Sequence, residues 1–185
     1  MLILETLIFS CLLPGTKFSD TGTGKTISLK PIGQEVALFF KLDDDSDTRK
    51  ACLGITGKCC DCLVYFADVK KSVFCLAELK GKNADQAAKQ IINTYDHLSQ
   101  TLTHSKNALS SHIAKCPECA SHANACPHCK NTYSGIAWKA IIHQKGASPN
   151  KLNQTLVQEL VTRFGKHGEG YDISHKEDIG YLLRK

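Results

Sequence analysis

The segment from Asp61 to Lys80 constrains the fold of this chain more than any other stretch. Residues 63–67 and 73–79 are rich in β-branched, aromatic and aliphatic side chains, and the mainly polar residues 68–72 separate them. This pattern predicts two strands joined as a hairpin. If the loop holds about four residues, which is a common hairpin length, Asp61 falls nearly opposite Glu78.

Three charged residues lie at the outer ends of these predicted strands, namely Asp61, Glu78 and Lys80. Glu78 and Lys80 are two residues apart, so both point to one face of the second strand. Two neighbouring carboxylates repel each other and are best neutralised by a hard divalent cation, usually Mg²⁺ when phosphate is the substrate. A nearby lysine can then position or help deprotonate a water molecule. The pattern indicates metal-assisted phosphodiester hydrolysis, although an exposed Glu-Lys ion pair and a turn-capping aspartate would give the same sequence.

The same residues resemble the PD-(D/E)xK nuclease superfamily, particularly its small bacterial members from defence or mobile-element contexts. The similarity covers residues 52–102: an aspartate that starts one strand, the Glu78-Leu79-Lys80 sequence that ends the next, and a helix that carries Gln90. It implies that Asp61 and Glu78 bind Mg²⁺ or Mn²⁺, with the Leu79 carbonyl as a further ligand. It also implies that Lys80 assists the attacking water and that Gln90 lines the site. The chain departs from the family pattern at Cys60, where proline is expected before Asp61.

Two CxxC pairs form the second firm motif of the sequence. Each pair contains a proline, and together they offer four thiolates, which is the usual ligand set of a structural Zn²⁺ site. Three histidines nearby are spare ligands, and an iron–sulfur cluster, a redox pair or free thiols are the alternatives. We therefore expect a zinc knuckle over residues 110–135, with the ligands Cys116, Cys119, Cys126 and Cys129.

Length and charge fit a single globular domain, 1–185, that binds a polyanion. The net charge is +5, and the stretch 101–151 holds six lysines but only one acidic residue. Nucleic acid, with DNA favoured, is the expected partner, and a homodimer or a protein partner is also considered. The apolar N-terminal run is too short to span a bilayer and lacks a positive leading region, so we expect no membrane association.

Cysteine usage points to a reducing compartment. Ten cysteines would suit a small secreted disulfide scaffold, but four of them form the CxxC pairs and others lie in apolar contexts. The cysteines around Asp61, at positions 52, 59, 60 and 62, are expected to be small buried hydrophobic residues. The expected location is the cytoplasm.

The rest of the chain predicts an α/β fold, with a restriction-endonuclease-like central mixed sheet flanked by helices and a zinc-knuckle insertion. We expect strands at 35–42, 136–144 and 171–173, and helices at 83–102, 152–164 and 175–183. Residues 19–31 are expected to form a loop. Its GTGKT sequence is not expected to bind a nucleotide, since Pro31 excludes a long helix after Thr26. Residues 43–45 predict a solvated turn.

The function that these observations favour is a Mg²⁺-dependent nuclease that cuts DNA, in a setting such as antiviral defence. A non-catalytic, zinc-stabilised adaptor that binds nucleic acid or protein is the main alternative. A redox or metal-sensing protein that uses the cysteines is the third class. Divalent-ion binding at Asp61 and Glu78 separates the first class from the others.

Overall fold

The computed structural model describes residues 7, 8, 10–43, 50, 53–79, 83–113, 136–144 and 152–185, with only the backbone described over 101–113. Lys80 and the four cysteines of the predicted zinc knuckle lie outside the described residues.

The centre of the fold is a six-stranded mixed sheet with the strand order β1-β4-β5-β6-β7-β8. Strands β1, β4, β5 and β6 pair antiparallel, whereas β6 with β7 and β7 with β8 pair parallel. The strands span Leu12–Leu13, Val36–Lys41, Cys62–Ala67, Ser72–Glu78, Ile136–His143 and Tyr171–Ser174. The predicted hairpin and the strands predicted at 35–42, 136–144 and 171–173 are therefore confirmed.

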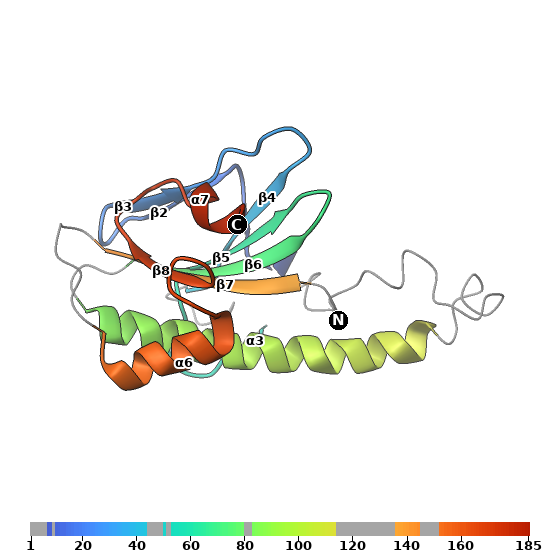
Figure 1. Ribbon diagram of the computed structural model, residues 1–185. Helices are drawn as coiled ribbons and strands as arrows, with labels where there is room; N and C mark the ends of the chain where they lie inside the picture. Colours follow the sequence, from blue (N-terminus) through green and yellow to red (C-terminus); the bar gives the residue numbers. More distant parts are fainter. Residues whose placement is uncertain are drawn as a thin grey trace.

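Two helices cover one face of the sheet, α3 (Ala84–Ile113) and α6 (Gln154–Phe164), which lie side by side in Figure 1. Both begin at an asparagine whose side-chain oxygen accepts a backbone N–H of the first turn: Asn83 from Gln86 at 3.0 Å and Asn153 from Thr155 at 2.9 Å. Helix α3 continues well beyond its predicted end at residue 102. No helix within the described ranges is both long and apolar enough to cross a membrane.

The packing of these helices explains why they form where they do. Apolar residues recur every three or four positions on α3 and α6 and meet alternate residues of the strands. Each such side chain removed from water stabilises the fold by about 1.5–3 kcal/mol. The fully buried members include Leu63, Leu76, Ala87, Ala88, Ile91 and Leu160.

The other face of the sheet is covered by a two-stranded ribbon and a short helix. The ribbon consists of β2 (Lys17–Asp20) and β3 (Lys25–Ser28), and the helix is α7 (Gly180–Leu183). They enclose a second core that contains Phe18, Ile27, Leu29, Ile179, Leu182 and Leu183. The sheet is thus buried on both faces.

Two sequence predictions fail on this face. The loop predicted over 19–31 is in part the β2–β3 ribbon, so a strand rather than a helix follows Gly24. The helix predicted over 175–183 is only Gly180–Leu183. Its first residues instead pair with β3, because Ser28 N donates to Glu177 O at 2.8 Å and Ile179 N donates to Ser28 O at 3.0 Å.

The strand directions give the sheet two distinct ends. At one end, β4, β6, β7 and β8 finish and β5 begins; Cys62 pairs with Ala77 here, which brings the preceding Asp61 beside Glu78. We call this the carboxylate end. At the other, the hairpin end, the β5–β6 loop lies beside the starts of β4 and β7. Helix α3 begins after β6 and runs back toward the hairpin end, so its first turns lie near the carboxylate end (Figure 1).

Candidate active site at the carboxylate end

The carboxylates of Asp61 and Glu78 each accept a backbone N–H from the neighbouring strand end, Glu78 from Asp61 and Asp61 from Leu79. Asp61 N donates to Glu78 Oε2 at 3.1 Å, and Leu79 N donates to Asp61 Oδ2 at 2.6 Å. The β5–β6 loop holds the four residues 68–71, so the register puts the two carboxylates next to each other, as the sequence predicts. Glu78 is fully buried although it ends a strand, and Asp61 is partly buried. A strand end with two adjacent carboxylates below the surface is costly unless cations compensate for the charge.

Helix α3 supports the segment that leads into Asp61. Gln90 Nε2 donates to Cys59 O at 2.7 Å, and Thr94 Oγ1 accepts from Cys60 N at 2.9 Å while donating to Gln90 O at 2.7 Å. Both side chains are more than nine-tenths buried. Both side chains thus face the segment that leads into Asp61. Gln90 Oε1 has no hydrogen-bond partner within the described residues.

Burial is the main influence on the pKa of the Cys59 thiol; nearby carboxylates act in the same direction and Lys50 opposes them. Burial, followed by the negative charge of Asp43, raises the pKa of the Cys59 thiol to about 12, and Glu78 and Asp61 act in the same direction. Asp43 forms an ion pair with Lys50 at 3.1 Å, so it does more than end a solvated turn. Cys59, Cys60 and Cys62 are buried free thiols, which agrees with their predicted role as small hydrophobic residues.

The chemistry of this site fits a divalent cation of the Mg²⁺ type. Such an ion is usually bound by one or two carboxylates, together with waters and substrate phosphate oxygens, rather than by a complete cage of protein ligands. Asp61 and Glu78 supply two carboxylates, and the Leu79 carbonyl belongs to the same turn of chain. Carboxylate and carbonyl oxygens are the ligands that a hard cation of this kind prefers. Among the described residues, no cluster of three or more acidic, histidine or cysteine side chains has metal-site geometry.

Two further buried polar residues at this end were not found from the sequence. Ile142 pairs with Glu78, so strand alternation places Gln144 on the face of Glu78 and His143 on the opposite face. Gln144 Nε2 and both ring nitrogens of His143 have no hydrogen-bond partner within the described residues. Lys25 Nζ donates to the His143 carbonyl at 2.8 Å. The burial of His143 and Gln144 is evident only in the three-dimensional structure, because a His-Gln pair that ends an apolar strand has no distinctive spacing in the sequence.

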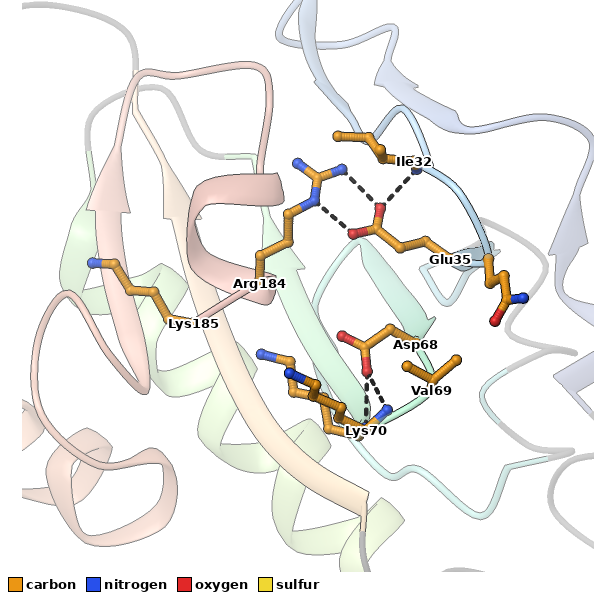
Figure 2. A pocket seen from close by; sticks show the side chains of 9 residues that line it. Ile32, Glu35, Asp68, Val69, Lys70, Arg184 and Lys185 are labelled. Carbon is orange, nitrogen blue, oxygen red and sulfur yellow. Dashed lines mark hydrogen bonds and ion pairs between the residues drawn. The ribbon is translucent and has the colours of Figure 1, made fainter.

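The hairpin end has a larger pocket, but its carboxylates are already engaged. This cavity of about 560 Å³ is lined by Glu35, Asp68, Arg184 and Lys185, among others (Figure 2). Arg184 donates to both oxygens of Glu35, at 2.8 and 2.9 Å. Asp68 Oδ1 accepts the backbone N–H groups of residues 70 and 71 at 2.7 and 2.9 Å. These bonds close a turn and attach the C-terminal segment to the start of β4, which is a structural role.

The predicted site residues thus have three outcomes. The structure brings together Asp61, Glu78 and the backbone of Leu79, and it places Gln90 beside the segment that leads to them. Lys80, Cys116, Cys119, Cys126 and Cys129 lie outside the described residues.

Comparisons with protein-family models, curated proteins and solved structures find no match to the chain. The function of this site has to be inferred from its own residues.

Proposed function

We propose that the protein is a metal-dependent nuclease of the PD-(D/E)xK type, with a restriction-endonuclease-like fold, that hydrolyses phosphodiester bonds in DNA. One observation carries the proposal: the pairing of β5 with β6 places the buried Glu78 beside the partly buried Asp61 at the end of a sheet, where Glu78 accepts from Asp61 N and Asp61 accepts from Leu79 N. Two carboxylates so close together favour a divalent cation over the bare pair of charges. The order of elements on which the sequence resemblance depends, strand, loop, strand and helix, is also the order observed.

In the proposed mechanism Asp61, Glu78 and the Leu79 carbonyl hold Mg²⁺ or Mn²⁺. The ion, when bound, supplies the Lewis acid that stabilises negative charge on the phosphate. Lys80 orients the attacking water, in the role that the resemblance implies. Gln90 fixes the segment before Asp61 by donating to the Cys59 carbonyl. Its Oε1 can accept a hydrogen bond from a donor such as water. Each of these residues therefore has a separate role.

The remaining parts of the proposal rest on the sequence. We propose a structural Zn²⁺ bound by the two CxxC pairs, a cytoplasmic location, and a setting in defence or in mobile elements. Buried free thiols at Cys59, Cys60 and Cys62 agree with a reducing compartment.

The test is a cleavage assay on plasmid, linear duplex DNA, single-stranded DNA and RNA, with Mg²⁺, Mn²⁺ or a chelator. The expected result is metal-dependent cleavage of DNA that Glu78→Ala and Lys80→Ala both abolish. If the wild type and both variants are equally inactive on every substrate while they remain folded, catalysis by the isolated chain is wrong. The non-catalytic adaptor would then be the better account, with the bonds between Asp61 and Glu78 serving only to hold the two strands together.

A further inference from the structure

A shallow groove, with lysine and amide groups among mainly apolar lining atoms, lies near the candidate active site, between residues 56–58 and the first turns of α3. Its volume is about 370 Å³. On the helix, the lining residues follow the spacing i, i+3, i+4, i+7, so they share one face. The lining consists of Thr56, Gly57, Lys58, Gln86, Lys89, Gln90 and Asn93.

The wall of this groove is held in place by hydrogen bonds to α3. Asn93 Nδ2 donates to the carbonyls of Thr56 and Lys58, at 2.9 Å in each case. Thr56 Oγ1 lies 2.9 Å from His97 Nε2. Gly57 has φ of +76°, a left-handed conformation that favours glycine. Because its shape is fixed by these bonds, the groove is preformed, and a ligand would not have to pay for ordering it.

The charge of the groove is opposite to that of the neighbouring carboxylate pair. Lys58 and Lys89 are exposed, no acidic residue belongs to the lining, and neither lysine has an ion-pair partner within the described residues. Thr56, Gln90 and Asn93 already use their polar groups within the protein, which leaves the Gln86 amide beside the two lysines. Ammonium and amide N–H groups are donors that contact phosphate oxygens in nucleic-acid complexes.

The groove and the candidate active site are linked through Gln90. Gln90 lines the groove, and its side chain donates to the carbonyl of Cys59, two residues before Asp61. A chain of regularly spaced phosphates that passes the carboxylates would therefore enter the groove with its neighbouring phosphates. A ligand with a single phosphate would have no reason to occupy both.

We infer that this groove binds the phosphodiester backbone of the substrate strand, with Lys58 and Lys89 as its phosphate contacts. The inference rests on the proposed function, since it names a substrate-binding surface for the same site. Backbone contacts of this kind add affinity without base specificity, and they make binding depend on salt.

The experiment measures the affinity of fluorescently labelled DNA, as single strand and as duplex, over a range of salt concentrations. The full chain carries Glu78→Gln throughout, so that the probe stays intact. Lys58→Gln and Lys89→Gln are each expected to reduce the magnitude of the slope of log K against log salt by about 0.7–0.9, and the double variant by about twice that. Lys166→Gln removes another exposed lysine, which follows the end of α6 and is not part of the groove lining, and is the control.

The outcomes separate the two proposals. If DNA binding depends on the two lysines but the wild-type chain cleaves no substrate, the proposed role of the groove stands and the proposed nuclease activity is wrong. If the chain shows metal-dependent cleavage but its Lys58→Gln and Lys89→Gln variants bind DNA like Lys166→Gln, the proposed nuclease activity stands. The proposed role of the groove in DNA binding is then wrong. Absence of any DNA binding at low salt would overturn the groove as well, and the cleavage assay would then decide on the nuclease by itself.

Discussion

The two ends of the central sheet both carry acidic residues, but they use them differently. At the hairpin end, Glu35 is bound by Arg184 through both oxygens, and Asp68 accepts two backbone N–H groups of its own turn. At the carboxylate end, Glu78 accepts from Asp61 N and Asp61 accepts from Leu79 N, near the buried Gln90, whose Oε1 has no partner within the described residues. Buried polar atoms are normally satisfied, so the unpartnered Gln90 Oε1 is the observation that favours a ligand at the carboxylate end. The cavity of about 560 Å³ belongs to the hairpin end, so cavity size alone would favour a different region.

Isosteric removal of one carboxylate at each end is expected to give the largest contrast. Glu78→Gln keeps an oxygen that can accept from Asp61 N, so the fold should persist while one metal ligand is lost. Loss of several kcal/mol of charge stabilisation lowers the rate of DNA cleavage by about 10²- to 10⁴-fold. Glu35→Gln at the hairpin end is expected to cleave at the wild-type rate. Equal rates for the two variants would remove the distinction between the ends.

The support that α3 gives to the carboxylate end should appear in both stability and activity. Thr94→Val leaves the buried Cys60 N–H without its acceptor, which costs about 1–3 kcal/mol of unfolding free energy. The displaced segment also carries Asp61, so cleavage is expected to slow. Thr162→Val removes a hydroxyl that bonds to its own exposed helix, and a change within about 0.5 kcal/mol is expected there. Urea unfolding of both variants measures the difference, and equal destabilisation would contradict the assigned role of Thr94.

Mild acid is expected to weaken the carboxylate end before the hairpin end. Burial, followed by the charge of Lys25, lowers the pKa of His143 from its ordinary 6.5; His175 acts in the same direction and Glu177 opposes it. The unfolded chain therefore takes up this proton at a higher pH than the folded protein. The unfolding free energy falls as the pH drops below about 6.5. His143→Leu should show a flatter profile in urea unfolding between about pH 7.5 and 5.5. An unchanged profile would show that His143 is not the group responsible.

The smallest expected effect is the acid response of the hairpin end. Hydrogen bonding to Arg184 lowers the pKa of Glu35 from its ordinary 4.5, and backbone hydrogen bonds lower the pKa of Asp68 from 3.8. Their contribution is present above these ordinary values and is lost as the pH falls through the lowered ones. Arg184→Gln should therefore be less stable than the wild type at neutral pH, and the difference should shrink in acid. A difference that stays constant from pH 7 to about pH 3 would contradict the ionic nature of this contact.

The sequence predicts the carboxylate pair because that geometry is local. A four-residue loop and strand alternation are sufficient to put Asp61 opposite Glu78. By contrast, the β2–β3 ribbon has only a few apolar residues among glycine and threonine, so its pattern resembles a loop. The segment before α7 pairs with β3 instead of forming a helix. The local spacing of Ile179 and Leu182 does not reveal that a strand distant in the sequence competes with helix formation. His143 and Gln144 are likewise defined only by burial between elements that are far apart in the sequence.

The central claim is that Asp61 and Glu78 bind a divalent cation. It is tested most directly by titrating the purified, zinc-loaded chain with Mn²⁺ and monitoring binding by calorimetry or by the electron paramagnetic resonance of the free ion. The wild type and Glu35→Gln are expected to bind Mn²⁺ saturably with the same affinity. Asp61→Asn and Glu78→Gln, which keep the backbone contacts and the melting temperature, are expected to lose that binding. Undiminished Mn²⁺ binding in both carboxylate-end variants, or absence of binding by the wild type, would contradict the assignment of this end as the metal site.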